Sequence, residues 1–301
     1  PEVWRKELTG CGMFWCTIKG KIFVKAVWNE AEKAGLSPGM EVIAIGGQPA
    51  GKWLDTRIAR ERDVFSFSTT QHARFYAMHS GLAEPRGKTL EIEVKDLKGK
   101  TSKRRIEYRD AKLGAHGPAF APKDLKGNQD VAFGRTSAGT GYIHIRRCKE
   151  NLPAAIDEAL LVLGDARGLV LDFRANSGGG FDHEQLMGRF IPAGKSLDFE
   201  KHYASAGPKP YTGPMVVIVD AGVVSAGETA AGMFKEDGRA YMIGESATAG
   251  MSSQKTTLEL PSGLFALYVS TASNMGRFND GKGIEGIGVP PHEIIEYDPR
   301  D

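Results

Sequence analysis

The sequence lacks the features that define several large classes of protein. No apolar run approaches the roughly 20 residues needed to span a bilayer, so no membrane span is predicted. Opposite charges nearly cancel, with 39 Lys and Arg against 37 Asp and Glu, and we expect no nucleic-acid partner. The longest basic run, 103–105, lies between β-like segments and is typical of a solvated strand edge.

Cysteine and metal-ligand patterns are equally sparse. Cys11, Cys16 and Cys148 make an odd number, which argues against a disulfide framework, although a Cys11–Cys16 bridge stays open. No pair of His or Cys shows ligand spacing with a third partner, so we expect no metal and no other cofactor. The chain starts at Pro1 without Met or an apolar leader, and we expect a processed or artificially truncated form.

The first part of the chain, up to about Arg109, consists of short β-like runs and one brief helix. Apolar and charged residues alternate in 90–94, which predicts a half-buried strand, and 22–27 and 41–45 are further strand candidates. Residues 30–36 predict one or two helical turns that end at Gly35. A Gly-, Pro- and Ala-rich interval at 113–127 is typical of a linker.

Strand and helix patterns alternate beyond this interval. Residues 141–145, 168–173 and 215–219 predict strands, and 152–163 predict an amphipathic helix. The strands at 168–173 and 215–219 each run into a turn of small residues and then a helix. This repetition predicts a layered α/β domain with a largely parallel sheet.

Two turns and one loop combine small residues with chemistry. Residues 174–180 read RANSGGG, and glycine amides after a buried strand can approach another group closely, although a flexible turn is the simpler interpretation. Ser225 precedes a helix, with Glu228 completing a capping box that needs no chemistry. The segment EGIGVPP at 285–291 presents Glu285 on a rigid loop, where a solvated surface carboxylate is the ordinary alternative.

A serine at a helix N-terminus lies next to unpaired amides and the positive end of the helix dipole. When a nucleophile attacks a carbonyl group, an oxyanion forms, and such donors stabilise it by several kcal/mol. Ser225 therefore suits helix capping, or a nucleophile with an adjacent donor in the amide of Ala226, and these two roles are compatible.

Four segments, in the same order, resemble the carboxy-terminal processing (tail-specific) serine protease family, which has the tricorn core protease as a relative. Residues 168–180 are similar to its strand and R-x-N-x-GG turn, and 216–228 to its nucleophile segment. The sequences GRAYMIGE at 238–245 and EGIGVPP at 285–291 resemble the two segments that follow. The likeness extends over nearly the whole chain, because parts of 9–48 are similar to a PDZ domain.

This resemblance implies a fold and a set of site residues. The fold is α/β, with a PDZ-like domain at 1–112 followed by a layered α/β (ClpP/crotonase-like) serine protease domain at 113–301. Ser225 would be the nucleophile, and the amide of Ala226 with one from Gly178 or Gly179 would form the oxyanion hole. The PDZ-like part would bind a peptide through its carboxylate-binding loop, which consists of Gly10, Cys11, Gly12, Met13 and Phe14.

The same resemblance implies a substrate and a location. The substrate would be a peptide or the C-terminus of an unfolded protein, cleaved through an acyl-enzyme on Ser225, with esterase activity as a side reaction. A bacterial periplasmic or secreted location is favoured. The physiological substrate and the oligomeric state do not follow from the sequence.

The chain departs from the family at the residue that activates the serine. Tail-specific proteases use a lysine in G-E-x-x-x-G-K-G, and Gly250 occupies that slot here. Lys255 lies five residues later and is typical of an exposed strand residue. The tricorn-like branch uses a histidine from before the PDZ domain and a glutamate that Glu285 matches. The base is therefore another histidine, or lies upstream of Pro1, or the activity is weak.

Three histidines deserve comparison as the base, because a serine hydroxyl is a poor nucleophile without one. His183 follows the glycine turn on the first turn of a helix and is the best candidate. His79 ends an amphipathic helix inserted in the PDZ-like part and could overhang the site. His144 alternates with apolar neighbours, which indicates a half-buried strand position.

Two other functions stay open. The fold could hold an apolar ligand or peptide without turnover, as the related retinoid-binding photoreceptor proteins do, and the missing lysine favours this. The PDZ-like part could also tether free C-terminal peptides as a scaffold. The retained Ser225, glycine turn and Glu285 favour a hydrolase.

Overall fold

The computed structural model describes residues 8–111, 121–194, 196–198 and 202–300, which form two compact units. Unit 1 holds residues 8–111 and the C-terminal tail 296–300, and unit 2 holds the described residues from 121 to 295. The boundary predicted between residues 112 and 113 lies outside the described residues. The return of the tail to unit 1 was not predicted.

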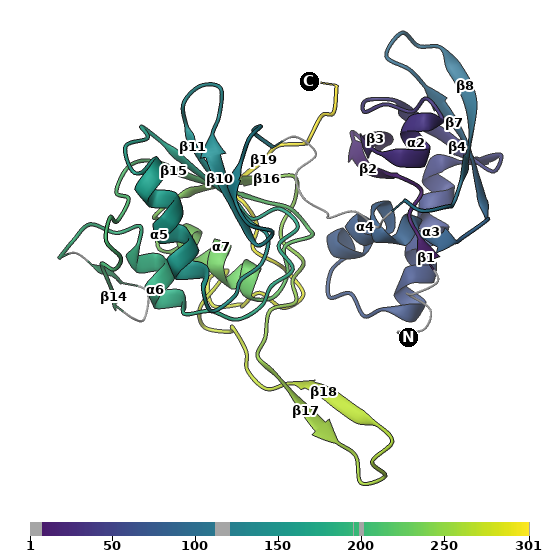
Figure 1. Cartoon of the computed structure of the whole chain (residues 1–301). Helices are drawn as coiled ribbons and strands as arrows, with labels where there is room; N and C mark the ends of the chain where they lie inside the picture. Colours follow the sequence, from purple (N-terminus) through teal and green to yellow (C-terminus); the bar gives the residue numbers. More distant parts are fainter. Residues whose placement is uncertain (1–7, 112–120, 195, 199–201, 301) are drawn as a thin grey trace. The chain divides into compact units, whose positions relative to one another are not determined.

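Unit 1 is built on a six-stranded antiparallel sheet in the order β2-β3-β4-β7-β8, with β5 paired to β4 (Figure 1). Helices occupy its connections, and a small β1–β6 pair stands apart. The strands are β1 (Leu8–Thr9), β2 (Met13–Ile18), β3 (Lys21–Val27), β4 (Glu41–Ile45), β5 (Gln48–Pro49), β6 (Glu84–Pro85), β7 (Thr89–Lys95) and β8 (Thr101–Glu107). The helices are α2 (Asn29–Lys33), α3 (Ala50–Val64), α4 (Thr70–Met78) and the 3₁₀ turn η1 (Ser80–Leu82).

The predicted elements of unit 1 are confirmed where the local pattern was strong. In β7 the apolar residues of the alternating run are buried, and β8, which carries the basic run 103–105, is an edge strand. Gly35 follows the last helical residues of α2 with φ +77°, a left-handed conformation that glycine adopts without strain. Cys11 and Cys16 are buried and form no disulfide, so the bridge between them is not present.

The C-terminal tail covers an outer part of the unit 1 sheet. Tyr297 packs against a small buried cluster of Cys16, Ile18 and Phe23, and the Lys25 ammonium lies 4.7 Å from the Tyr297 ring centroid. The amide of Lys19 donates to Glu296 at 3.1 Å. The tail is therefore held by apolar and polar contacts together.

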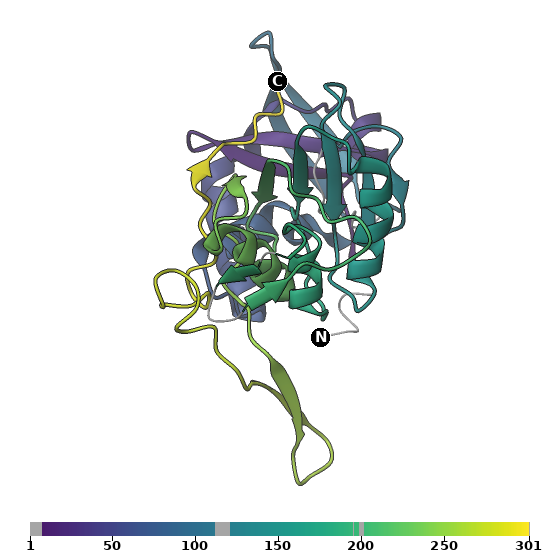
Figure 2. The ribbon, with the colours of Figure 1, turned by 90° about the vertical axis from the view of Figure 1, so that its left-hand side faces the viewer.

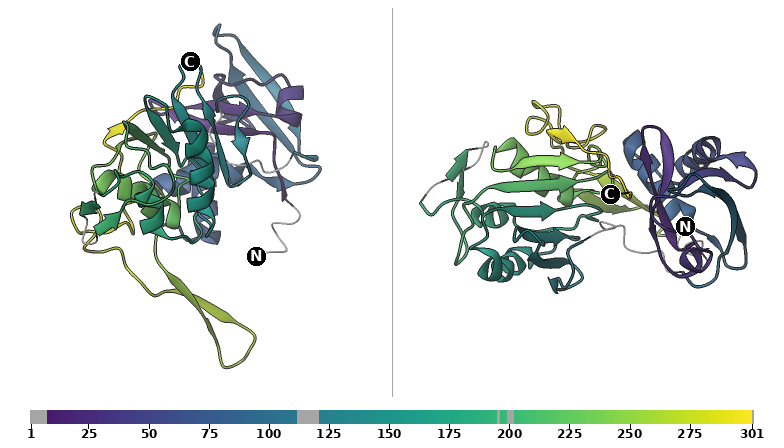
Figure 3. Two further views of the ribbon diagram at one scale, coloured as in Figure 1. Left: turned by 60° about the vertical axis from the view of Figure 1, so that its left-hand side comes forward. Right: turned by 90° about the horizontal axis from the view of Figure 1, so that it is seen from above.

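Unit 2 contains a seven-stranded sheet in the order β19-β16-β15-β12-β11-β10-β9, seen from above in Figure 3. The pairs from β11 to β19 are parallel, and β9 and β10 add an antiparallel end, which confirms the largely parallel sheet. The strands are β9 (Lys126–Gly127), β10 (Val131–Arg135), β11 (Gly141–Ile145), β12 (Leu169–Asp172), β15 (Met215–Val219), β16 (Tyr241–Gly244) and β19 (Glu293–Ile294).

Three helices and two hairpins complete unit 2. Helix α5 (Leu152–Leu163) has the predicted bounds, and α6 (His183–Gly188) and α7 (Ala226–Glu236) follow the two predicted turns. Two-stranded sheets are formed by β13 (Ser196–Asp198) with β14 (His202–Ala204) and by β17 (Lys255–Glu259) with β18 (Ala266–Ser270). The linker prediction needs correction at its end, because Lys126–Gly127 is strand β9. A bilayer-spanning helix is not found in the described part of the chain.

Candidate active site

The glycine turn and the Ser225 turn lie side by side at the carboxyl ends of the strands of the unit 2 sheet. Strands β12 and β15 are parallel neighbours, with Asp172 opposite Ile218. Their carboxyl ends therefore lie side by side, where open parallel sheets place their ligand sites. The turn at 173–180 follows β12, and the turn at 220–225 follows β15.

Ser225 adopts a strained backbone conformation at the start of α7, with φ 54° and ψ −127°. Such a conformation costs a non-glycine residue about 1–3 kcal/mol and is found preferentially at functional sites. A sharp, strained turn from strand to helix also exposes the nucleophilic serine of the α/β-hydrolase fold. The local geometry is thus more than a simple helix cap requires.

The buried carboxylate of Glu228 holds this turn in place. Glu228 is fully buried and accepts the amide of Ser225 at 3.0 Å, which is one half of the predicted capping box. It also accepts the Thr248 hydroxyl and the Gly250 amide, each at 2.6 Å, and the Met251 amide at 3.0 Å. Burial raises the pKa of Glu228, while these four donors act in the opposite direction.

The glycine turn approaches Ser225 very closely. A Cβ built on Gly178 would lie 2.7 Å from the Ser225 Cβ and 3.4 Å from its Oγ. The Gly178 amide is already engaged, because it donates to Asn176 Oδ1 at 2.8 Å. Within the described residues, the amides of Gly179 and Ala226 donate to no protein acceptor, and both residues line the same cavity as Ser225.

Asn176 connects the two turns, a role to which the sequence analysis assigned no residue. Its side chain is fully buried and donates to Ile145 O at 2.7 Å while accepting the Gly178 amide. Its backbone carbonyl accepts the Val224 amide at 3.0 Å. Gly227 packs against it, since a Cβ there would lie 2.4 Å from Asn176 Oδ1.

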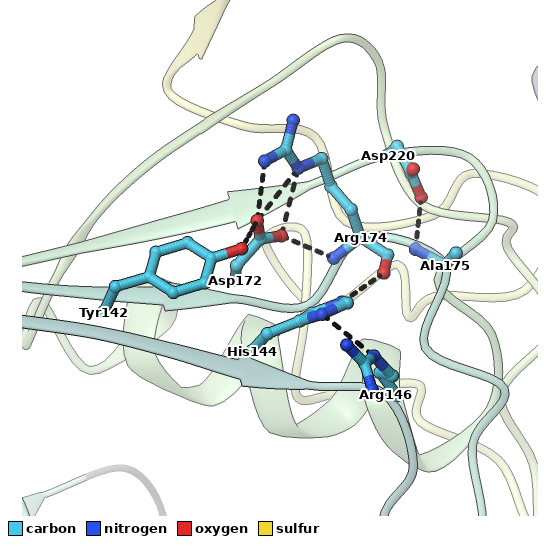
Figure 4. Close-up of polar contacts among 7 residues, drawn as sticks. All are labelled: Tyr142, His144, Arg146, Asp172, Arg174, Ala175 and Asp220. Atoms are coloured by element: carbon cyan, nitrogen blue, oxygen red, sulfur yellow. Dashed lines mark hydrogen bonds and ion pairs between the residues drawn. The ribbon is translucent and has the colours of Figure 1, made fainter. Parts of the chain in front are cut away.

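Asp220 forms a second connection between the turns (Figure 4). One carboxylate oxygen, Oδ1, accepts the Ala175 amide and the Gly222 amide, each at 2.9 Å. Ala175 has φ 56°, so its conformation also needs support from its surroundings. A single buried carboxylate therefore joins a residue before the glycines to a residue before Ser225.

A charged network lies behind the glycine turn (Figure 4). Asp172 is fully buried, pairs with Arg174 at 2.6 Å and accepts the Tyr142 hydroxyl at 2.7 Å. Burial alone would raise the pKa of Asp172, but the Arg174 guanidinium holds it below its usual range. The pair fixes the chain directly after β12, where the glycine turn begins.

His144 belongs to this network. Its Nδ1 accepts from Arg146 Nε at 3.2 Å, so Nε2 carries the proton and donates to Arg174 O at 3.2 Å. The ring is buried rather than half-buried as predicted, and burial lowers its pKa. Figure 4 shows this histidine among scaffold residues, and it does not line the Ser225 cavity.

The cavity beside Ser225 measures about 420 Å³. Its wall carries the hydroxyl of Ser225, the turn around Gly179, the start of α7 and the ring of His183. The opposite wall comes from residues at the base of the β17–β18 hairpin, including Gln254 and Asn274. The cavity therefore brings together the side chain of Ser225, two residues whose amides have no protein acceptor among the described residues, and a histidine.

The family model described as Peptidase family S41 matches residues 139–295, which is just over half of the chain. The chain belongs to peptidase family S41. It is 26% identical over 287 residues to a carboxyl-terminal-processing protease from Picosynechococcus, a match that covers 90% of the chain and 59% of the relative. A carboxy-terminal processing protease, CtpB, from Bacillus subtilis is 25% identical, over 76% of the chain and 44% of that protein. The matches thus cover only 59% and 44% of the length of these two relatives.

Solved structures support the same fold. The crystal structure of mature CPAF superimposes with a TM-score of 0.72 at 12% identity, covering 98% of the chain and 79% of that structure. At this identity the likeness concerns the fold alone. The fold that the two proteins share is the mixed α/β architecture described above for this S41 chain.

Of the predicted base and the predicted closing glutamate of this S41 chain, the histidine lies at the Ser225 cavity and the glutamate does not. His183 is the first residue of α6, half-buried, with its ring 4.1 Å from that of Phe181 on the cavity wall. Among the described residues, no hydrogen bond joins a histidine to Ser225. Glu285 lies on an exposed loop and does not line the Ser225 cavity.

The loop that carries Glu285 nevertheless reaches the serine turn through Thr248. The Val289 amide donates to Thr248 Oγ1 at 2.7 Å, and that hydroxyl donates to Glu228. The Gly286 amide donates to Gly250 O at 2.9 Å. Gly250, in the lysine slot, thus belongs to the backbone that supports Glu228, while Lys255 lies half-buried on β17 beside Tyr268.

The remaining predicted site residues lie in unit 1. His79 caps α4 and is buried, with its Nδ1 2.6 Å from Phe75 O and its ring stacked on Phe75. This is the environment of a packed core residue. His183, which lines the Ser225 cavity, is therefore the better candidate for the base. In the loop from Gly10 to Phe14, the side chains are buried and the Gly12 carbonyl accepts the Trp28 amide at 2.7 Å. Its peptide-binding role stays a prediction.

Proposed function

We propose that this S41 chain is a serine peptidase that cleaves peptide bonds by acylating Ser225. The observation that carries the proposal is the juxtaposition of a strained serine with the amides of Gly179 and Ala226 in one cavity. Ser225 Oγ would attack the scissile carbonyl, and the resulting oxyanion would accept from both amides. One such donor contributes about 3–4 kcal/mol to transition-state stabilisation.

The general base of the proposal is His183. It would take the proton of Ser225 during attack and return it to the leaving amine, after which water would hydrolyse the acyl-enzyme. Gly250 occupies the lysine slot, so a lysine base is not available there. A histidine, the base used by the tricorn-like branch, is therefore favoured. For Glu285 we propose an indirect role, in which its loop supports the Ser225 turn through Thr248 and Glu228.

We further propose that the substrates are the C-terminal parts of peptides or unfolded proteins. The relatives support this, since they are named carboxyl-terminal-processing proteases. Unit 1 would act as a PDZ-like domain that binds the free C-terminus. Esters would be hydrolysed as well, because their leaving groups are better.

A fluorophosphonate tests the nucleophile. Intact mass should show one adduct on the wild-type chain and none on Ser225→Ala, and peptide mapping should place it at Ser225. A chain that forms no adduct would be a ligand-binding protein on the same fold, which is the alternative that the missing lysine favours.

Alanine replacements of single histidines test the base. His183→Ala should lower turnover of an activated ester by about 10²–10⁴-fold, the contribution of a general base. His79→Ala, in unit 1, serves as the comparison and should retain ester turnover if the protein folds. If His79→Ala lowered ester turnover more than His183→Ala did, His79 and not His183 would be the base.

A further inference from the structure

The β17–β18 hairpin forms a two-stranded sheet of its own and projects from the rest of unit 2 (Figure 2). All of β18 is exposed, and so is β17 after Lys255. Isolated two-stranded hairpins are marginally stable in water. Its outer edges also leave main-chain groups unpaired, because within the described residues each strand pairs only with the other.

The register divides the hairpin into a polar face and an apolar face. Directly opposed residues of an antiparallel pair share a face. Lys255 opposes Ser270 and Thr257 opposes Tyr268, which makes one face mainly polar. Leu258 opposes Leu267, and the remaining residues of the second face are Thr256 with Val269 and Leu260 with Phe265.

The apolar face is open to solvent. Phe265 is 70% exposed, Leu258 is 51% and Leu267 is 50%. Contiguous exposed apolar surface is uncommon on soluble proteins and marks interaction sites. A stripe of alternate apolar side chains with a free strand edge beside it matches an extended polypeptide, which can add as a further strand.

The hairpin is continuous with the candidate active site. The Thr271 amide donates to Gln254 O at 2.8 Å at its base, where Ser253 and Ser270 share a hydroxyl hydrogen bond of 2.8 Å. Gln254 and Asn274 line the Ser225 cavity. A chain that follows the hairpin toward its base therefore arrives at the Ser225 cavity.

We propose that the β17–β18 hairpin is a docking arm for an extended apolar segment of the polypeptide substrate, outside the cleaved bond. The segment would pair with the outer edge of β18 and place alternate side chains beside Phe265, Leu267 and Val269. This proposal rests on the proposed function, because it assigns the hairpin to the substrate of Ser225. Continuity with the cavity favours the substrate over a second copy of the chain.

The test measures binding without turnover. Fluorescein-labelled casein, an unfolded polypeptide, is titrated with the Ser225→Ala chain and followed by fluorescence anisotropy. Adding Leu258→Thr and Leu267→Thr keeps β-forming residues but removes the opposed apolar pair, and should weaken binding at least about tenfold. Tyr268→Thr changes a side chain of the polar face that is 72% exposed; it is the control and should change binding less than about twofold.

Each outcome separates the explanations. Equal casein affinity in the double variant and its parent would overturn the proposal, as would equal losses in the double variant and Tyr268→Thr. Sedimentation equilibrium that shows a dimer dissociating in the double variant would make the face a contact between copies instead. In the chain that keeps Ser225, the double substitution should leave ester turnover within about twofold of the wild-type value. Its thermal midpoint should equal that of the wild type, which would show that the fold is intact. A wild-type chain without a fluorophosphonate adduct would sink the proposed function and with it the assignment of the bound segment as a substrate, whereas the casein titration would still report whether the hairpin binds an extended polypeptide.

Discussion

At the scale of single residues, the site depends on residues that do not line the cavity. Asn176 and Asp220 each bond to both turns, so they set the distance between Ser225 and the glycine amides. Neither was assigned a role from the sequence. Their partners lie up to 48 residues away along the chain, and no local spacing indicates such contacts.

Removing the Asp220 carboxylate should misplace the turns. In Asp220→Ala the Ala175 and Gly222 amides lose their shared acceptor, and we expect the second-order rate of fluorophosphonate labelling to fall about 10–100-fold. Asp220→Asn keeps an oxygen able to accept both amides and should retain most of the rate. Labelling of the alanine variant at the wild-type rate would show that the bridge is irrelevant.

Neighbouring glycines should differ sharply in their tolerance of a methyl group. Gly178→Ala would place a Cβ 2.7 Å from the Ser225 Cβ at φ +77°, so we expect at least about a tenfold loss of labelling. Gly180→Ala is the matched control, because a Cβ there meets nothing within 4 Å. Similar labelling rates in the two variants would contradict the close approach of the turn.

At the scale of elements, strong local patterns predicted well. β4, β11, β15 and α5 have the predicted bounds. Burial alternates along β15 and recurs at helical spacing in α5, whereas every residue of β11 is buried. The apolar face of the β17–β18 hairpin was missed, although 255–270 alternates around a Pro-Ser-Gly turn that could have indicated a hairpin. The Thr248 relay could not be predicted, because it joins residues 20 and 41 positions apart.

Helix α4 should make the chain sensitive to mild acid. His72 is half-buried beside Phe67, and burial lowers its pKa from 6.5 to about 4. The unfolded chain therefore takes up a proton at higher pH than the fold does, so this contribution to stability is present above pH 6.5 and is lost between pH 6.5 and 4. Urea unfolding should show about 1–2 kcal/mol lost between pH 7 and 5.

His72→Gln provides the comparison for this pH effect. Glutamine does not titrate, so the variant should lose less stability than the wild type over the same interval. Equal pH dependence in the two proteins would assign the effect to other groups.

At the scale of the whole molecule, two units with separate cores share one chain. The tail 296–300 returns to unit 1 after β19, so the units are joined by two passages of the chain. The order of the two parts follows from local patterns in the sequence, but this return of the tail does not. Tail contacts such as Tyr297 with Phe23 join residues more than 270 positions apart, which local patterns do not encode.

The PDZ-like role of unit 1 predicts recognition of a free C-terminus. A labelled peptide with a free carboxylate should bind the Ser225→Ala chain, and amidation of its C-terminus should weaken binding at least about tenfold, as removal of a charged anchor does. Gly12→Ala, where a Cβ would lie 2.2 Å from Trp28 O, should also weaken it. Equal binding of acid and amide would remove the carboxylate-binding role.

The most direct test of the account is a crystal structure of the fluorophosphonate adduct on the full chain. We predict phosphorus bonded to Ser225 Oγ, with the phosphoryl oxygen 2.7–3.1 Å from the amide nitrogens of both Gly179 and Ala226. An adduct whose phosphoryl oxygen points into solvent, with those amides turned away from it, would contradict the account.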